Sequence, residues 1–268
     1  MEFLMSTIEK TIAGYLWPLF RISSMFMVMA IFGASTTPAR VRLMLALAVT
    51  FAVAPMLPEM PLTPLFSFQG MFITAQQVLI GIAMGFVSVM MLQTFVLTGQ
   101  IIGMQTSLGF ASMVDPGSGQ QVPAVGNFFL ILSTLLFLQL DGHLLMIKML
   151  IASFETLPVS TQGIQIGNYK AIADWGAYMF GAALTMSISA ILALLLINLS
   201  FGVMTRAAPQ LNIFSIGFPI TMLSGLLVLW LTLNPIMAHF SEVWNSAQVL
   251  MCDILQLQCQ VSAGKGGH

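Results

Sequence analysis

Charged residues are nearly absent from this chain. Of its 268 residues only 6% are Asp, Glu, Lys or Arg, whereas 58% are hydrophobic. A soluble domain has about 25% charged residues, so the composition excludes an ordinary soluble protein and indicates an integral membrane protein. The formal net charge is −1, with no cluster of Lys and Arg. We therefore expect no nucleic-acid partner, because nothing in the sequence offers a basic surface to phosphate groups.

Cysteine and histidine are also scarce. The two cysteines, Cys252 and Cys259, are seven residues apart. If their segment is helical, this spacing places them about 10 Å apart along the helix axis, too far for a disulfide, so we expect two free thiols. The histidines His143, His239 and His268 are far apart in the sequence. We therefore expect no metal site and no cofactor.

Catalytic motifs are missing as well. The acidic residues are scattered, and neither a G-x-S-x-G nucleophile motif nor a phosphate-binding loop of the Walker type is present. We expect that the protein is not an enzyme.

What the chain has instead is a series of apolar runs. A bilayer core requires about 20 apolar residues per helix, because each helix must satisfy its own backbone polar groups. Several runs are short or interrupted by proline, and the third can continue as a helix toward residue 109. The six runs are Thr11–Ala34, Leu43–Leu57, Met71–Leu97, Val125–Leu140, Trp175–Met204 and Ile213–Met237.

The last part of the chain has the clearest helical pattern. The fifth and sixth runs flank a short loop carrying Arg206, which predicts a helical hairpin. Residues 141–175 hold five of the charged residues and are predicted to form a partly exposed connection. An amphipathic helix is predicted after the hairpin. Its apolar face comprises Phe240, Val243, Trp244, Ala247, Leu250, Met251, Ile254 and Leu257.

These patterns together predict an all-α, membrane-associated fold. About six apolar helical segments, several of them broken, are arranged in helical hairpins and followed by the amphipathic C-terminal helix. The whole chain, residues 1–268, is treated as one domain.

Small and polar residues inside the apolar runs indicate how the helices pack. Gly81 and Gly85, like Gly99 and Gly103, are four residues apart, a spacing that lets helix backbones approach closely. We expect tight helix packing here rather than a moving hinge. Glutamines such as Gln77 are costly against lipid and need protein or water as partners.

Arg21 interrupts the first run. An ionisable group within an apolar segment is a functional candidate by default. The other interpretation is that it pairs with backbone carbonyls or with another subunit, and the sequence leaves both open.

A glycine-rich stretch separates the third and fourth runs. Residues 103–126 contain Gly103, Gly109, Gly117, Gly119 and Gly126, together with two prolines. Glycine permits unusual backbone conformations and proline stops helices. A simple turn needs only a few residues, and irregular backbone at membrane depth persists only inside protein or beside a water-filled cavity. The stretch is therefore predicted to fold back into a confined space.

Two motifs carry a family resemblance. "GQIIGMQTSLGFASMVDPGSGQ" from Gly99 and "NLSFGVMTRAAPQLNIFSIGFPI" from Asn198 resemble the FliR family. This family is the flagellar member of the type III export gate subunits, which include the SctT proteins of injectisomes. The resemblance covers nearly the whole chain, and the Arg-Ala-x-Pro-Gln-x-Asn run between two apolar arms is its most specific part.

The resemblance implies a subunit of a protein-export channel in the bacterial inner membrane, at the flagellar basal body. Its partners would be several copies of FliP and FliQ, other export apparatus and proximal rod proteins, and the unfolded polypeptides that are exported. Residues 1–165 would resemble FliP and residues 170–260, with the C-terminal hairpin, would resemble FliQ. Much of such a gate lies above the membrane plane, which would explain the poor spans.

The resemblance also makes the glycine-rich stretch a plug inside the pore. On physical grounds, sealing a pore wide enough for an unfolded polypeptide requires a constriction that adapts in shape, which a flexible glycine-rich backbone with Met113 and Val114 at the narrow point would supply. The plug residues would be Gly103, Gly109, Met113, Val114, Asp115, Pro116, Gly117 and Gly119. A second hypothesis rests on the hydrogen-bonding groups gathered at the hairpin turn. This hypothesis is that the residues at the turn form a contact, either with another subunit or at the tip of the hairpin. The residues are Arg206, Pro209, Gln210 and Asn212.

Two other functions remain open. A small-molecule secondary transporter also builds its site from broken apolar helices, but it predicts charged groups for coupling ions and a visible internal repeat, and both are weak in this sequence. A passive assembly scaffold would conduct nothing.

Overall fold

The computed structural model describes most of the chain. The described residues are 2–34, 37–58, 60–61, 63, 67–106, 112–114, 121–160, 163–207 and 213–257. Within these ranges, the description covers only the backbone of residues 2–10, 112–114, 121–122, 166, 205, 207 and 213–216.

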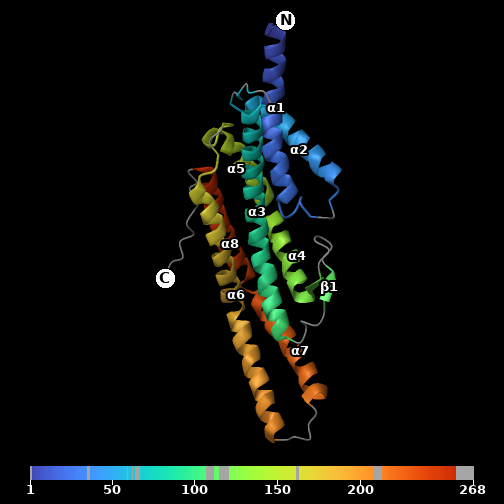
Figure 1. Ribbon diagram of the computed structural model, residues 1–268. Helices are drawn as coiled ribbons and strands as arrows, with labels where there is room; N and C mark the ends of the chain where they lie inside the picture. The colour runs from blue at the N-terminus through green and yellow to red at the C-terminus, as the bar shows by residue number, and fades with distance from the viewer. Residues whose placement is uncertain are drawn as a thin grey trace. The chain divides into compact units, whose positions relative to one another are not determined.

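The described part of the chain is helical apart from one small ribbon of two strands (Figure 1). This confirms the predicted all-α fold class. The elements are α1 (Glu2–Val28), α2 (Ala39–Val53), the 3-10 helix η1 (Ala54–Met56), α3 (Phe68–Gln105), β1 (Ser112–Val114), β2 (Gln121–Pro123), α4 (Ala124–Gln139), α5 (Gly142–Thr156), α6 (Ile166–Ala207), α7 (Ile213–Leu233) and α8 (Ile236–Leu255).

The chain forms two compact units that are interleaved along the sequence. Unit 1 comprises Met1–Val89, Leu140–Trp175 and Asn245–His268, and unit 2 comprises Met90–Gln139 and Gly176–Trp244. The borders fall inside α3, α6 and α8 and between α4 and α5. They do not coincide with the two parts expected from the resemblance, whose division near residues 165–170 stays a prediction.

The predicted apolar runs correspond to helices α1, α2, α3, α4, α6 and α7. The third run does continue as helix, since α3 extends to Gln105. Pro235 interrupts the helix between α7 and α8, and the helix axis bends by 58° at this point. Proline cannot donate a backbone hydrogen bond, and its ring clashes with the preceding turn of a helix. The predicted amphipathic helix is α8, and Phe240, Ala247 and Met251 on its apolar face are buried.

The predicted connection over residues 141–175 is wrong in its first part. Gly142–Thr156 forms helix α5, and α6 begins at Ile166, earlier than expected. Charged residues such as Lys148 and Glu155 obscure the pattern, but Met146, Leu150 and Phe154 share one buried face at helical spacing. Asp141 begins the helix with a φ of 53°, in the left-handed region that Asp tolerates better than most residues.

Fewer than six of these helices are long and apolar enough to cross a membrane by themselves. Among the described residues, three helical stretches are long and apolar enough to cross a membrane, or up to five if each bent pair counts as one span. The three are Ala39–Met56, Phe68–Gln105 and Gly167–Met204. The first run, now α1, is not among them, because Arg21 and its polar neighbours lower its hydropathy. The second run qualifies because η1 extends α2 to Met56.

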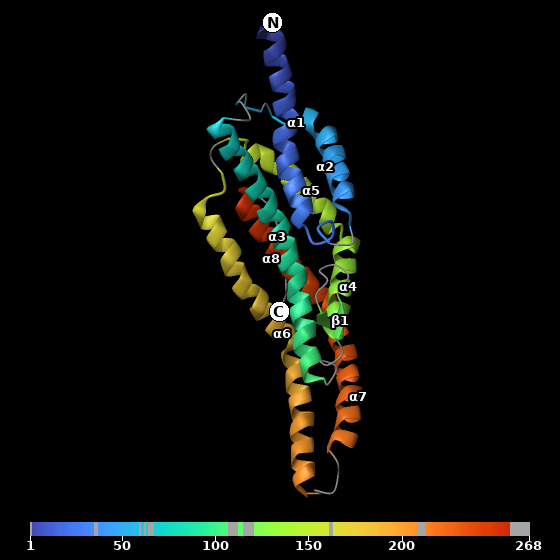
Figure 2. The same ribbon diagram turned by 45° about the vertical axis from the view of Figure 1, so that its right-hand side comes forward.

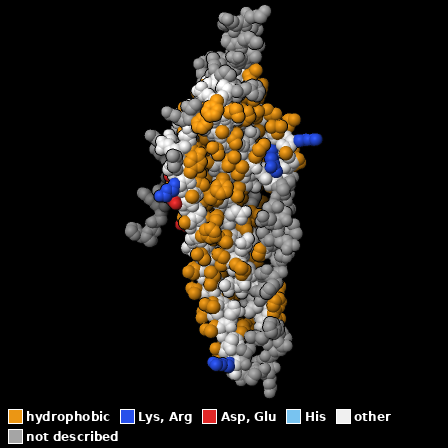
Figure 3. Space-filling view, in the orientation of Figure 1, with side chains coloured by type: hydrophobic (Ala, Val, Ile, Leu, Met, Phe, Trp, Pro, Cys, Tyr) orange, Lys and Arg blue, Asp and Glu red, His pale blue; other side chains and the backbone are white. Residues whose placement is uncertain are grey.

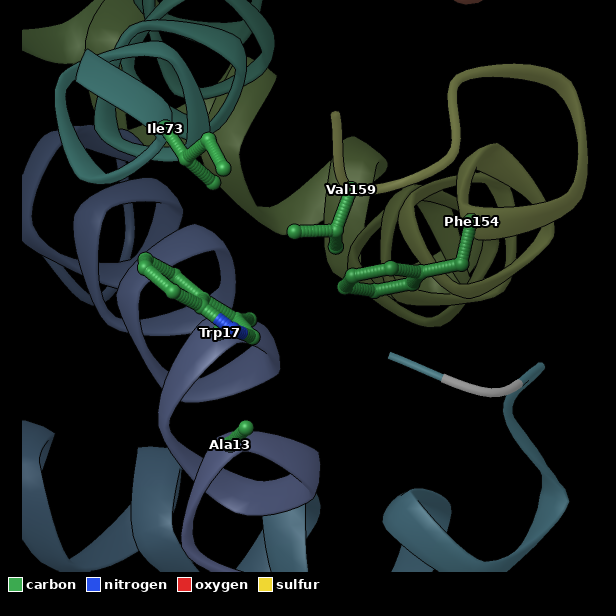
Figure 4. Packing of buried hydrophobic residues seen from close by; sticks show 5 residues of the cluster. All are labelled: Ala13, Trp17, Ile73, Phe154 and Val159. Atoms are coloured by element: carbon green, nitrogen blue, oxygen red, sulfur yellow. The ribbon is translucent and has the colours of Figure 1, made fainter. Parts of the chain in front are cut away.

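The core of unit 1 joins α1, α3 and α5. Figure 4 shows its central cluster, in which Trp17 of α1, Ile73 of α3 and Phe154 of α5 converge with Ala13 and Val159. Trp17 and Phe154 are completely buried. In the same unit α1 and α2 lie side by side in both ribbon views (Figures 1 and 2), with the rings of Tyr15 and Phe51 stacked at 5.9 Å between centroids.

Glycines bring the helix backbones into direct contact, as the four-residue spacing predicted. In unit 1, a methyl group at Gly85 of α3 would lie 2.9 Å from the carbonyl oxygen of Met25 in α1. In unit 2, a methyl group at Gly99 would lie 2.7 Å from the carbonyl oxygen of Val125 in α4. Such distances leave no room for a side chain, so the packing interpretation is confirmed at both sites.

The expectation of free thiols is wrong for Cys252, which is disulfide-bonded. The argument against a disulfide assumed a continuous helix through Cys259, but α8 ends at Leu255. Cys259 lies outside the described residues.

The surface is unusually apolar. Hydrophobic side chains cover much of the visible face in Figure 3, and charged side chains are few. Phe180, Leu192 and Leu196 on α6, for example, are between 56% and 64% exposed. Side chains of this kind face lipid or another protein rather than water.

Candidate functional site

Arg21 lies at the centre of unit 1, where its guanidinium joins three parts of the fold. It is completely buried. Its Nε donates to Oε1 of Gln77 in α3 at 2.8 Å, and its Nη1 donates to Oγ of Ser153 in α5 at 2.9 Å. Its Nη2 donates to the carbonyl oxygen of Leu157, just after α5, at 2.9 Å. The carbon between its nitrogens lies 4.1 Å from the centroid of the Phe154 ring.

The buried charge of Arg21 is stabilised by the carboxyl end of α5. All three of its hydrogen-bond acceptors are neutral, so the compensation comes from oriented dipoles. Ser153 and Leu157 belong to the last turn of α5 and its C-cap, where the helix dipole is negative, and the face of the Phe154 ring attracts a cation. Desolvation by burial lowers the pKa of Arg21 to about 9, which leaves the group protonated at neutral pH.

This geometry favours one of the two interpretations left open for Arg21. A carbonyl and neutral side chains of the same chain take up its donors, as the pairing interpretation required, and Gln77 finds the protein partner that its position in an apolar run predicted. The sequence could not identify Ser153 or Leu157, because both lie more than 130 positions away in a region that was predicted to be a connection.

The second feature is the base of the glycine-rich stretch, in unit 2. Thr106 ends the last turn of α3 and is completely buried. Its hydroxyl donates to the carbonyl oxygen of Gly103 at 3.2 Å, and its amide donates to the carbonyl oxygen of Ile102, also at 3.2 Å. On its other side it meets Gly225 of α7, where a methyl group would lie 2.6 Å from both Cβ and Cγ2 of Thr106.

The other end of the stretch is also held against α3. The short antiparallel ribbon pairs Met113 with Val122 and Val114 with Gln121, and β2 leads directly into α4. The first turn of α4 packs against α3, since a methyl group at Gly126 would lie 3.1 Å from Cγ of Gln100. The first stem, at the end of α3, is therefore fixed against α7 through Thr106, and the second is fixed against α3 through the start of α4.

The structure describes only part of the predicted plug. Gly103 is buried in α3, and the backbones of Met113 and Val114 form β1. Gly109, Asp115, Pro116, Gly117 and Gly119 lie outside the described residues. Sequence analysis missed Thr106 and Gly225, whose contact fixes the first stem, because nothing in the pattern links two positions on different helices.

The predicted contact at the hairpin tip is described only at Arg206. Helices α6 and α7 run side by side in unit 2 in both ribbon views (Figures 1 and 2). Arg206 is exposed in the last turn of α6, where a cation is favoured by the helix dipole. Pro209, Gln210 and Asn212 lie outside the described residues.

Metal-binding clusters are not found in the described part of the chain, where no group of three or more His, Cys, Asp and Glu side chains could hold an ion.

Comparison with known proteins agrees with the motifs. The family described as bacterial export proteins, family 1, matches residues 12–247. The flagellar biosynthetic protein FliR of Escherichia coli strain K12 is 38% identical to this chain over 246 residues, covering 90% of this chain and 92% of the relative.

Two other relatives carry the same name. FliR of Pectobacterium carotovorum is 38% identical over 248 residues, covering 91% of this chain and 93% of the relative. FliR of Aquifex aeolicus is 30% identical over 227 residues, covering 85% and 88% respectively. The match is therefore not confined to one motif or one group of bacteria, and the chain belongs to the FliR/SctT family of bacterial export proteins and is a component of flagellar protein export.

Proposed function

We propose that this chain is a structural subunit of the flagellar type III export gate, without catalytic activity, and that it helps to form and seal the channel for unfolded flagellar proteins. It acts in the bacterial inner membrane at the basal body. Its direct companions are FliP and FliQ, and it also meets other export apparatus and proximal rod proteins and the exported polypeptides.

The anchoring of the glycine-rich stretch carries this proposal. A seal has to stay in place while its middle adapts in shape to what passes. The contact between Thr106 and Gly225 and the packing of Gly126 on α3 fix the two ends. Between them, the sequence supplies glycine and methionine, the residues with the most adaptable backbone and side chain. Fixed ends around an adaptable middle suit a plug better than a passive connector.

The exposed apolar surface supports assembly with companions. Leu199 and Val203 near the end of α6 and Leu223 on α7 are between 62% and 68% exposed. A patch of this kind is stable only against lipid or a second protein. Arg206 lies on the same hairpin and is proposed to contribute a polar contact with a companion, together with Pro209, Gln210 and Asn212.

Deletion of Gly109–Gly117 tests the seal. This change removes β1 but leaves both stems intact. When the gate is overproduced, cells with the deletion should leak small ions, measured as loss of membrane potential or as sensitivity to a small toxic solute. Copurification of FliP and FliQ at the wild-type level must be shown for the same variant. Normal assembly with unchanged permeability would contradict the proposed seal.

Purification in mild detergent tests the assembly. A gate subunit should be recovered with companions of different sequence, which mass spectrometry identifies. A secondary transporter would be recovered alone or as a symmetric oligomer. A passive scaffold would bring the companions along, but the deletion in the plug would leave permeability unchanged.

A further inference from the structure

A cleft with mostly apolar walls and a few polar groups lies between α6 and α8 in unit 2. Two adjoining cavities, of about 210 and 280 Å³, share Thr185, Met186 and His239 in their walls. The first reaches toward α3 and α7 at Thr98 and Thr232, and the second reaches Glu242 on α8. The FliR assignment does not involve any of these residues.

Four polar groups in the walls, three threonine hydroxyls and one carboxylate, can accept hydrogen bonds, while His239, which borders both cavities, can donate or accept. The hydroxyl of Thr98 donates to the carbonyl oxygen of Thr94 at 2.9 Å, and that of Thr185 donates to Gly181 at the same distance. The hydroxyl of Thr232 donates to Leu229 at 2.7 Å. Since a hydroxyl has one hydrogen, these oxygens can only accept from a molecule in the cleft, and so can the carboxylate of Glu242. The complementary occupant is a donor that carries positive charge.

Glu242 supplies an exposed negative charge at one end of the cleft. In the described part of unit 2 it is the one acidic residue, and it forms no ion pair or hydrogen bond there. Its neighbours in the cavity include Ala182, Met186 and Val243, which offer an apolar wall. An occupant with an alkyl stem and a cationic head would use both parts of the cleft.

The surroundings indicate that this occupant comes from a protein helix. Phe180, Leu184 and Ile188 on α6 are between 53% and 56% exposed beside the cleft, within the apolar stretch Gly167–Met204. A free cation in water could pair with Glu242 but would leave these apolar side chains uncovered. An apolar helix that carries a single basic residue would cover these side chains and place its charge at Glu242.

We propose that the cleft between α6 and α8 binds a lysine side chain projecting from an apolar helix of a neighbouring gate subunit. Single acceptors distributed around the cleft match the three donors of an ammonium group better than the planar fork of arginine. Glu242 forms the ion pair, the threonine oxygens accept the remaining donors, and Met186 packs on the alkyl stem. The inference rests on the proposed gate assembly.

Carbodiimide coupling of the intact, copurified gate tests the contact. This reagent joins a carboxylate to an amine only when the two touch. The expected product links Glu242 to a lysine of a companion subunit, identified by mass spectrometry of the linked peptides. This linked product should be absent from the Glu242→Gln variant. It should remain in the matched control Glu155→Gln, which removes an exposed carboxylate from unit 1.

A second variant tests the acceptor geometry. Thr185→Val keeps the volume of the side chain and removes one acceptor, so the yield of the Glu242 product should fall about tenfold, as expected for the loss of roughly 1.4 kcal/mol of binding free energy. Thr134→Val, on α4 and outside the cleft, should leave the yield unchanged.

The outcomes separate this inference from the function on which it rests. If the wild-type gate copurifies with its companions but Glu242 couples to no lysine, or couples only to a lipid amine, the lysine site is wrong and the gate assignment stands. If no companion copurifies with the wild-type chain, the assembly itself is contradicted and the inference falls with it.

Discussion

The Nε of Arg21 donates a hydrogen bond of 2.8 Å to Oε1 of Gln77, joining α1 to α3 across 56 positions of sequence. Together with the hydrogen bonds to Ser153 and Leu157, this bond lets one side chain of α1 connect its own helix to α3 and α5. A charge in this position is stable only while its neutral partners and the end of α5 remain in place.

Replacement of Arg21 by methionine should destabilise unit 1. Methionine keeps the length of the side chain but leaves the acceptors of Gln77, Ser153 and Leu157 buried without their donor. The expected cost is on the order of 3 kcal/mol, measured as a lower thermal unfolding temperature in detergent. Arg206→Met is the matched control, because Arg206 is exposed, and it should leave that temperature nearly unchanged. An equal effect of both variants would contradict the buried role of Arg21.

Alanine at Gly99 and alanine at Gly181 should have opposite effects. At Gly99 the added methyl group would meet the backbone of α4 at 2.7 Å, whereas at Gly181 no atom lies within 4 Å. Gly99→Ala should therefore destabilise the protein by about 1–3 kcal/mol through a forced backbone shift. Gly181→Ala should stabilise it by up to about 1 kcal/mol through helix propensity alone. The test compares the thermal unfolding temperatures of the two variants under identical conditions. A higher unfolding temperature for Gly99→Ala than for the wild type would exclude the close contact.

Alanine at Gly225 should disturb the glycine-rich stretch from a distance. The added methyl group would collide with Thr106 at 2.6 Å and shift the stem on which the stretch is anchored. If the stretch seals the channel, Gly225→Ala should increase ion leakage. Adding Thr106→Gly removes both colliding atoms and should restore part of the wild-type permeability. Gly176→Ala, at a position on α6 where an added methyl group meets no atom within 4 Å, is the control. If leakage rises equally in this control, the contact between Thr106 and Gly225 does not explain the effect.

Alanine at Arg206 should affect assembly without affecting the fold of the isolated chain. The residue is exposed at the end of α6, so its loss leaves no buried group unsatisfied. We expect weaker copurification of FliP and FliQ and reduced swimming, with an unchanged unfolding temperature. Intact copurification together with normal swimming would show that the hairpin tip makes no essential contact through this residue.

The elements predicted correctly are those whose periodicity is set by one buried face. Helix α8 is the clearest case, because Phe240, Ala247 and Met251 repeat at helical spacing and lie inside. Helix α5 was missed for the opposite reason. Its buried residues Met146 and Phe154 are as regular, but Lys148 and Glu155 on the exposed face interrupt its apolar sequence.

The candidate site could be predicted only where its chemistry is local. The glycines and prolines of residues 103–126 reveal an irregular segment, and Arg21 stands out in an apolar run. The anchors are different, because Thr106 meets Gly225, and Arg21 meets Leu157, only after distant helices pack. A single sequence does not show which distant residues pack together. A threonine or a glycine in an apolar run also has no chemical property that marks it as part of a contact.

The interleaving of the two units limits how this protein can be dissected. Unit 1 is assembled from three stretches of the chain and unit 2 from two, so no truncation at a single position yields either of them whole. Chimaeras with a relative must exchange matched sets of stretches, and a fragment ending after α4 would expose the surfaces of α3 that α5 and α8 normally cover.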